Sequence, residues 1–328
     1  MQIQSFVVRF AGEGGQGMVT SAEVLVQAAA SVGYHVQSSS TFPSQIMGGP
    51  TWAQARISGT PVLSSGDDLD VLVAFNKEAY DTHGGEVREG GVTIYNSGDF
   101  QLDSNEFSFG MPFAELARST GNTRAENMVV IGAFAQLIGM PLDYLEAFVV
   151  KRFTRGRPGD EEIIKANVMA LKLGADQASG SGFSVGRLPE PQPPDYPQVL
   201  IRGNEGISLG ALAAGLDYFV GYPISPATTI LVYMQRNLVG PGKFVYQSSS
   251  EIESINAILG AGYAGRKSMT STAGPGLSLM SEGIGMGWMA EIPAVIVNVQ
   301  RGGPATGLPT KTEQSDFNIA LNPAHGDS

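Results

Sequence analysis

Residues 3–17 read IQSFVVRFAGEGGQG, and this stretch predicts the opening of an α/β fold. Its first half, Ile3–Phe10, has the length and the apolar composition of a buried β-strand. Glycines then turn the chain, and residues 18–32 carry apolar side chains on one face of a helix that stops at Gly33. A strand, a tight glycine turn and a helix in this order form the first part of a βαβ unit.

The same alternation continues to residue 173. Further strands are predicted at residues 51–57, 69–75 and 92–95. Helical periodicity follows at residues 113–119, 127–138, 142–148 and 160–173. Because strands alternate with helices, we expect an α/β domain with a mainly parallel sheet.

A change in composition divides the chain. Residues 177–197 read QASGSGFSVGRLPEPQPPDYP, in which serine and glycine give way to proline without apolar periodicity. Such a segment is typical of an extended linker. We therefore predict a first domain over residues 1–178, a linker over 179–197 and a second domain over 198–328.

The second domain repeats the alternation of the first. Strands are predicted at residues 218–220, 244–247, 268–272 and 294–299, and helices at 204–216, 228–237, 250–264 and 277–289. After residue 304 the chain runs through polar sequence to Ser328 without a closing strand or a capped helix. We therefore expect the second domain to be incomplete and the chain to be a C-terminally truncated piece of a longer polypeptide.

Composition excludes several kinds of site. The 328 residues include no cysteine and only 3 histidines, which excludes disulfides, thiolate zinc sites and cysteine-ligated iron–sulfur clusters in this chain and predicts no metal site. The net charge of −11 argues against nucleic acid and against an anionic membrane surface as partners. The start lacks the pattern of a signal peptide, and the apolar run 292–299 is too short to span a membrane, so we expect a cytoplasmic protein.

The glycine turn has three interpretations. Gly12, Gly14 and Gly17 fit the pattern G-x-G-x-x-G, and with Gly15 and Gln16 they form a turn between a strand and a helix. Such a turn serves only to pack strand against helix, or it binds a phosphate group such as that of CoA, or it binds NAD. NAD is disfavoured because residues 34–40 contain no Asp or Glu for a ribose.

Three loops of the second domain place candidate side chains where its strands end, the usual ligand edge of an α/β sheet. Ser225 lies between two prolines at a helix start, where its hydroxyl would serve a ligand or cap the helix. Glu251 falls in the first turn of a helix, where the dipole favours a carboxylate with or without a ligand. Arg301 follows a buried strand and would bind the carboxylate of a ligand or of the protein itself.

Several segments together carry a more specific resemblance. In the second domain they are GYPISP (221–226), EIESIN (251–256), GAGYAG (260–265), TAGPG (272–276), LMSEG (279–283), AEIP (290–293) and VQRGGPATGLPTK (299–311). They resemble the α subunit of the 2-oxoacid:ferredoxin oxidoreductases, which depend on thiamine diphosphate. The first domain resembles the γ subunit of that family through GEGGQG (12–17) and FPSQIMGGP (42–50). A fused γ–α chain is typical of 2-oxoglutarate or broad-range 2-oxoacid enzymes.

The resemblance implies a fold and a set of site residues. The fold is a γ-type α/β domain followed by the pyrimidine-binding α/β domain of a thiamine-diphosphate enzyme, with a mainly parallel sheet. The family's catalytic glutamate falls on Glu251, which would hold the aminopyrimidine ring so that the thiazolium carbon is deprotonated. The substrate carboxylate is expected at Arg301. Tyr222 and Pro223 are expected on the pyrimidine side, and Ser225 would face the substrate.

Two departures from the family pattern lie beside these residues. Ser225 stands where the family usually has threonine, which keeps the hydroxyl but puts packing and substrate range in doubt. The run Ser248–Ser250 stands before Glu251, where acidic residues are common in the family. These departures leave the assignment of Glu251 itself unchanged.

The resemblance also implies partners and a reaction. A β subunit would hold the diphosphate and Mg²⁺ through a Gly-Asp-Gly tripeptide that this chain lacks, and would carry a 4Fe–4S cluster, in a dimer of αβ heterodimers. With CoA and ferredoxin, the complex would decarboxylate a 2-oxoacid such as 2-oxoglutarate to acyl-CoA and CO2, or run the reverse carboxylation of CO2 fixation. Two alternatives remain: a non-catalytic assembly subunit of such a complex, and an NAD-dependent dehydrogenase.

Overall fold

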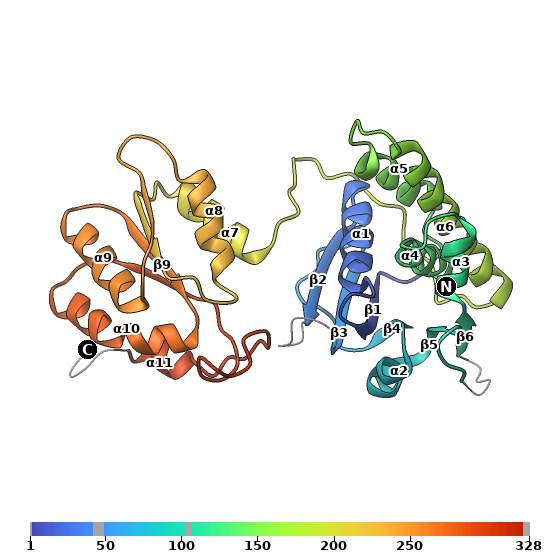
Figure 1. The fold of residues 1–328 in the computed structure, drawn as a ribbon, viewed down its shortest axis with the longest axis horizontal. Helices are drawn as coiled ribbons and strands as arrows, with labels where there is room; N and C mark the ends of the chain where they lie inside the picture. The colour runs from blue at the N-terminus through green and yellow to red at the C-terminus, as the bar shows by residue number, and fades with distance from the viewer. Residues whose placement is uncertain (1, 42–48, 103–106, 324–328) are drawn as a thin grey trace. The chain divides into compact units, whose positions relative to one another are not determined.

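A computed structural model describes residues 2–41, 49–102 and 107–323 of the chain (Figure 1). The chain forms two compact units, the first ending at Leu200 and the second beginning at Ile201. The FPSQIMGGP segment that carries part of the resemblance lies, except for Gly49 and Pro50, outside the described residues.

The first unit contains a mixed sheet of six strands in the order β2-β3-β1-β4-β5-β6. Their bounds are β1 Ser5–Glu13, β2 His35–Thr41, β3 Pro50–Ser58, β4 Leu69–Ala74, β5 Val87–Asn96 and β6 Ser108–Met111. Strands β1, β4, β5 and β6 run parallel, with Val8 beside Val71, and β3 is antiparallel to both β1 and β2. The prediction of an α/β domain with a mainly parallel sheet is confirmed.

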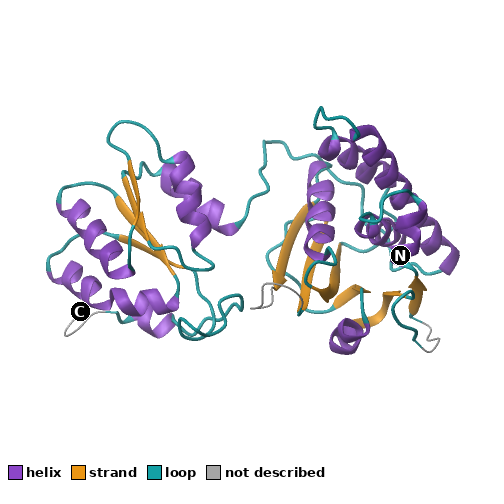
Figure 2. Ribbon diagram, viewed as in Figure 1, coloured by secondary structure: helices purple, strands orange, loops and turns teal. Residues whose placement is uncertain are grey.

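Helices cover both faces of this sheet (Figure 2). They are α1 Met18–Ser31, α2 Lys77–His83, α3 Phe113–Ser119, α4 Glu126–Leu137, α5 Leu142–Phe153 and α6 Asp160–Ser181, with a short 3-10 helix at Gly84–Glu86. Phe6, Val8 and Phe10 of β1 point into the main core with α1 and α4, while Val7 and Ala11 face the side of α2. The alternation follows from the two-residue period of a strand.

Two strands of the first unit have no apolar pattern to predict them. The sequence of β2, HVQSSST, is rich in serine, and its strand conformation comes from pairing with β3 along its whole length. β6 is only four residues long and forms the other edge of the sheet.

Helix α6 is longer than its predicted range of 160–173. It continues to Ser181, and Gly182, with a φ of 74°, ends it.

Much of the predicted linker packs on the first unit. The N–H of Val185 donates to the carbonyl of Leu137, and the N–H of Ile3 donates to the carbonyl of Arg187. The hydroxyl of Tyr34 donates to the carbonyl of Pro189 over 2.9 Å. These bonds join a proline-rich segment to the first unit, although the segment has no helix or strand of its own.

The second unit contains a sheet of four strands, all parallel, in the order β10-β9-β7-β8. The strands are β7 Tyr218–Gly221, β8 Phe244–Gln247, β9 Ser268–Thr272 and β10 Val295–Asn298; the helices are α7 Gly203–Ala213, α8 Thr228–Asn237, α9 Glu251–Tyr263, α10 Gly274–Met289 and α11 Phe317–Leu321. Phe219 of β7 packs with Met234 of α8 on one face, and Val220 packs with Ile258 of α9 on the other. All carboxyl ends of the strands therefore meet at one edge.

Candidate functional site

The carboxyl edge of the second sheet brings together loops that are far apart in the sequence. Residues 222–227 follow β7, Ser248–Ser250 follow β8, Ala273 follows β9, and Val299–Arg301 follow β10. A guanidinium nitrogen of Arg301, Nη1, donates to the carbonyl oxygen of Ser225 over 3.0 Å. This bond connects the loop after an edge strand with the loop after a central strand, as the sequence pattern predicts for a ligand edge.

The serines after β8 build the start of helix α9. Ser250 is the N-cap, and its hydroxyl accepts from the N–H of Glu253 over 3.2 Å. The N–H and hydroxyl of Ser249 both donate to the Glu253 carboxylate, over 2.6 and 2.7 Å, and these bonds lower the pKa of Glu253. The hydroxyls of Ser248 and Ser254 lie 2.5 Å apart inside the unit. The Ser-x-x-Glu pattern of residues 250–253 indicates the N-cap from the sequence, but the Glu253 carboxylate accepts from Ser249 and not from the N-cap residue.

Glu251 is the first residue of α9 and is held in place by this capped start. Its side chain lies inside the unit, and only 5% of the residue is exposed. Among the described residues, none donates a hydrogen bond to its carboxylate, which lies beside the first turn of α10. An ionised side chain that is 5% exposed and has no donor is unfavourable unless a ligand supplies one, which makes Glu251 a candidate ligand-binding residue.

Arg301 is equally buried, at 5% exposure, and its guanidinium is only partly used. Nη1 donates to Ser225 and Nη2 donates to the carbonyl of Ala305 over 3.0 Å, while Nε is buried without a partner. Both acceptors are neutral backbone carbonyls, so the positive charge has no partner carboxylate in these bonds. A guanidinium placed in this way can bind an anionic ligand.

The other predicted residues of this edge are more exposed. Tyr222 is 37% exposed, Ser225 is exposed, and Pro223 is half-buried. The contact of Ser225 with Arg301 uses its backbone carbonyl and not the hydroxyl that the sequence pattern singled out. No hydrogen bond or ion pair joins Glu251 to Arg301 among the described residues.

The edge also contains polar residues that sequence reasoning missed. Asp316 places its carboxylate against Gly274, the first residue of α10, and accepts from the amide of Asn298 over 3.0 Å. The remaining amide oxygens of Asn298 and Gln300 are buried without partners. Because a carboxylate of the protein already lies at the start of α10, this helix end is not free for an anionic ligand.

The glycine turn of the first unit is stabilised by the side chain of Gln16. The amide oxygen of Gln16 accepts from the N–H of Glu13 over 2.7 Å. A Cβ on Gly12 would lie 2.4 Å from that oxygen, and Gly15 and Gly17 have φ angles of 103° and 94°. Steric reasons therefore favour glycine at positions 12, 15 and 17 even without a ligand. Its binding of a phosphate group stays a prediction.

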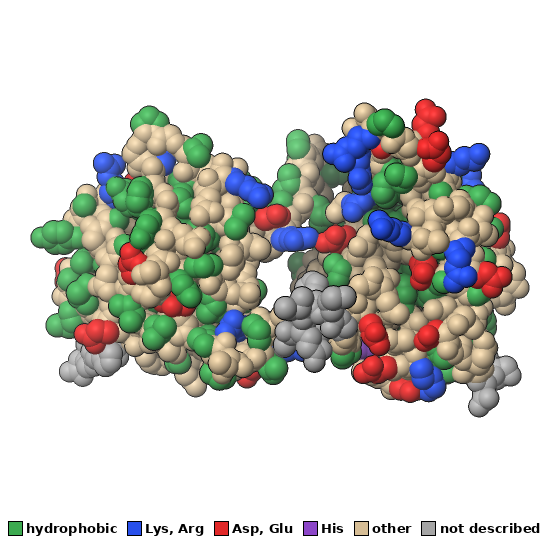
Figure 3. All heavy atoms as spheres, in the orientation of Figure 1, with side chains coloured by type: hydrophobic (Ala, Val, Ile, Leu, Met, Phe, Trp, Pro, Cys, Tyr) green, Lys and Arg blue, Asp and Glu red, His purple; other side chains and the backbone are tan. Residues whose placement is uncertain are grey.

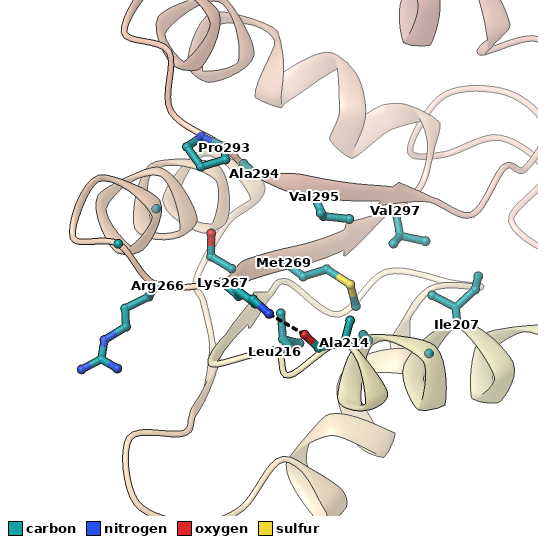
Figure 4. Close-up of a pocket in the computed structure, with 15 residues that line it drawn as sticks. Ile207, Ala214, Leu216, Arg266, Lys267, Met269, Pro293, Ala294, Val295 and Val297 are labelled. Carbon is teal, nitrogen blue, oxygen red and sulfur yellow. Dashed lines mark hydrogen bonds between the residues drawn. The ribbon is translucent and has the colours of Figure 1, made fainter.

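Two larger cavities of the second unit lie on the faces of its sheet and contain neither Glu251 nor Arg301. The first, of about 680 Å³, lies between α7 and the strands β9 and β10 and is lined mainly by apolar side chains, with a Lys267 ammonium that donates to the Ala214 carbonyl (Figure 4). The second, of about 740 Å³, lies on the side of α9 and α10. Their linings lack the convergent polar groups of a catalytic site.

Neither a metal cluster nor a membrane span is found in the part of the chain that the structure describes. Within residues 2–41, 49–102 and 107–323, no group of three or more His, Cys, Asp or Glu side chains is arranged to hold a metal ion. Across the same ranges, no helix combines the length and the apolar character needed to cross a membrane.

Comparison with known proteins connects the two units to one family. The family described as pyruvate ferredoxin/flavodoxin oxidoreductase matches residues 7–177, and its thiamine diphosphate-binding domain matches residues 209–326. The 2-oxoglutarate oxidoreductase subunit KorA of Mycobacterium tuberculosis is 35% identical over all of this chain and 55% of its own length. The 2-oxoglutarate synthase subunit KorA of Methanocaldococcus jannaschii is 46% identical over 39% of this chain and 35% of its own length.

A solved structure extends the similarity to the fold. The 2-oxoglutarate:ferredoxin oxidoreductase from Magnetococcus marinus, solved with 2-oxoglutarate, coenzyme A and succinyl-CoA bound, is 38% identical with a TM-score of 0.91. The alignment covers 99% of this chain and 57% of that one, so the chain spans a little over half the length of such relatives. The resemblance drawn from the sequence motifs is confirmed, and the chain belongs to the pyruvate ferredoxin/flavodoxin oxidoreductase family.

Proposed function

We propose that this chain is the catalytic α subunit of a thiamine-diphosphate-dependent 2-oxoacid:ferredoxin oxidoreductase, with 2-oxoglutarate as the leading substrate. The reaction is oxidative decarboxylation with CoA to acyl-CoA and CO2, with electrons passed to ferredoxin, or the reverse carboxylation. The single observation that carries the proposal is the carboxylate of Glu251, which is buried at the carboxyl edge of the sheet without a donor from the described residues. Relatives named for 2-oxoglutarate support the choice of substrate.

Glu251 fits the role of holding the cofactor's aminopyrimidine ring. When bound, thiamine diphosphate supplies a nucleophilic carbon and an electron sink for decarboxylation. A ring N–H would satisfy the carboxylate that this chain leaves without a donor. By accepting that hydrogen bond, Glu251 favours the protonated ring nitrogen and so promotes removal of a proton elsewhere on the cofactor. Tyr222 and Pro223, on the neighbouring loop after β7, would lie on the pyrimidine side.

Arg301 fits the role of binding the substrate carboxylate. Its Nε–H is buried and unused, and its charge faces only backbone carbonyls. The Ser225 carbonyl fixes the guanidinium, and the Ser225 hydroxyl, exposed on the same loop, is free to face the substrate. In this proposal one loop both orients Arg301 and lines the substrate site.

A β subunit would complete the site. We place the 4Fe–4S cluster on that subunit because these 328 residues contain no cysteine, and the diphosphate and Mg²⁺ there because they contain no Gly-Asp-Gly tripeptide. We expect a dimer of αβ heterodimers that reduces ferredoxin. The second unit shows many hydrophobic side chains at its surface (Figure 3). Exposed apolar residues of α9 and α10 suit burial against other chains; they are Ile252, Tyr263, Leu279, Met286, Trp288 and Met289.

The glycine turn of the first unit, Gly12 and Gly14–Gly17, contributes to CoA binding in this proposal. Most of the turn is exposed, and it lies between β1 and the start of α1. The N–H groups of Glu13, Gly14 and Gln16 already donate within the protein, so a phosphate would use the N–H groups of the first turn of α1. The domain division 1–178, 179–197 and 198–328 is kept as part of this proposal; the two family matches cover residues 7–177 and 209–326.

The test is the Glu251→Gln variant in the complex with its β subunit. We expect 2-oxoglutarate-dependent, CoA-dependent reduction of ferredoxin to fall by about 10²- to 10⁴-fold, because the amide cannot hold the ring nitrogen in its protonated form. Glu282→Gln, on the exposed side of α10, is the matched control and should keep full activity. Full activity of Glu251→Gln would instead support the non-catalytic assembly role.

A further inference from the structure

Helix α10 has a glycine in its first turn that faces Glu251. A Cβ built on Gly276 would lie 2.7 Å from both Cγ and Oε1 of Glu251, and 2.0 Å from the hydroxyl oxygen of Thr272. Real Cβ atoms do not approach other atoms so closely. The volume that any other residue would fill at position 276 is therefore occupied by the side chains of Glu251 and Thr272.

The residues around Glu251 are themselves held in place. The start of α9 is fixed by the Ser250 cap and by the buried pair of Ser248 and Ser254. Thr272 is fully buried at the end of β9, and its hydroxyl donates to the carbonyl of Ala273. Because no hydrogen bond from the described residues holds the Glu251 carboxylate, packing against α10 decides where it points.

We propose that Gly276 is a positioning residue: its missing side chain seats the Glu251 carboxylate in the orientation that the cofactor needs. The proposal rests on the proposed function of Glu251. The three nearest atoms that a methyl group at position 276 would meet belong to side chains: the hydroxyl oxygen of Thr272, and Cγ and Oε1 of Glu251. These side chains, and not backbone, would therefore have to shift. The expected consequence is thus a misplaced carboxylate in a folded protein.

The experiment compares glycine-to-alanine variants of the complete complex. Its main measurement is the rate at which the C2 proton of bound thiamine diphosphate exchanges with D2O, followed by NMR after rapid quenching. For Gly276→Ala we expect this rate to fall at least tenfold, with the KM for 2-oxoglutarate changed less than twofold. The dissociation constant of thiamine diphosphate and the Tm are measured for every variant.

Two other glycines provide matched controls. A Cβ on Gly210 in α7 would meet nothing within 4 Å, so Gly210→Ala should leave the exchange rate unchanged. A Cβ on Gly283, also in α10, would lie 2.7 Å from the side chain of Ile255, so Gly283→Ala strains the same helix away from Glu251. It should lower the Tm without a selective loss of proton exchange.

The outcomes separate this proposal from the proposed function. If Glu251→Gln slows proton exchange and Gly276→Ala does not, the positioning role is overturned and the function of Glu251 stands. If Glu251→Gln exchanges at the normal rate, the proposed function fails first. Should Gly276→Ala not fold, the double variant Thr272→Ala/Gly276→Ala removes the 2.0 Å contact and keeps the contact with Glu251. Normal exchange in that double variant, measured against Thr272→Ala alone, likewise overturns the proposal.

Discussion

At the residue scale, Glu251 and Arg301 share a feature that distinguishes them from ordinary buried charges. Each is 95% buried, yet neither has a partner of opposite charge among the described contacts. Buried charges are normally paired because desolvation is costly. Two unpaired charges of opposite sign at one sheet edge fit the proposed site, in which the cofactor donates to Glu251 and the carboxylate of the substrate binds Arg301.

Replacement of Arg301 should affect binding of the substrate more than turnover. We expect Arg301→Ala to raise the KM for 2-oxoglutarate by about tenfold to a hundredfold, which is the value of a hydrogen bond to a charged group. Arg301→Lys should recover part of the loss, because an ammonium keeps the charge but not the planar fork. Steady-state kinetics of the complex measure both effects. Arg266→Ala, at the cavity away from the site, is the control, and an unchanged KM for Arg301→Ala would place the carboxylate elsewhere.

At the element scale, glycine has different roles at different positions of a helix. A Cβ on Gly132 of α4 would lie 2.0 Å from the carbonyl oxygen of Leu171 in α6, and a Cβ on Gly174 would lie 1.9 Å from that of Val129. These two glycines allow α4 and α6 to pack backbone against backbone. Apolar periodicity predicts both helices, but it does not reveal how closely they approach.

Gly174→Ala should therefore destabilise the first unit. Because rigid backbone and not a flexible side chain blocks the methyl group, we expect a loss of about 1–3 kcal/mol or more in the free energy of unfolding. Gly180→Ala in the same helix is the matched control, since a Cβ there meets nothing within 4 Å. It should stabilise the protein by about 0.5–1 kcal/mol through helix propensity. Urea denaturation measures both, and equal stabilities would contradict the close packing of α4 and α6.

At the scale of the whole molecule, the proline-rich segment is attached to the first unit through Tyr34. Burial, assisted by the nearby Glu190 carboxylate, raises the pKa of Tyr34 to about 12. Since the neutral phenol donates to Pro189, the folded state favours the protonated form. The stabilisation is fully present below about pH 10, the ordinary pKa of tyrosine, and is lost as the pH rises toward 12.

Tyr34→Phe should loosen this attachment. We expect a loss of about 1 kcal/mol in the free energy of unfolding at pH 8 and faster proteolysis between residues 185 and 200. The difference between wild type and Tyr34→Phe should shrink from pH 10 to pH 12, as ionisation removes the donor in the wild type. Tyr196→Phe, at a tyrosine that is 67% exposed in the same segment, is the control. A difference that does not depend on pH in this range would assign the effect to packing alone.

Much of the fold could be predicted from local pattern. The strand at Ile3–Phe10, the four strands of the second unit and most helices follow from apolar periodicity, because burial of one face is encoded within each element. The strand β2 could not be predicted, because its serine-rich sequence becomes a strand only through pairing with β3. The length of α6 was also underestimated, since its last residues keep helical structure without a clear apolar pattern.

The site divides in the same way. The sequence alone predicts that Glu251 starts a helix after a run of serines and that Arg301 follows a buried strand. It also shows that these residues include no cysteine. Tertiary structure alone decided that the Ser225 carbonyl holds Arg301, that Asp316 lies at the start of α10 and that Gly276 makes room for Glu251. The physical reason is the separation of the residues along the sequence. Periodicity and capping act between neighbours in the chain, whereas these contacts join distant residues that only the parallel sheet brings together.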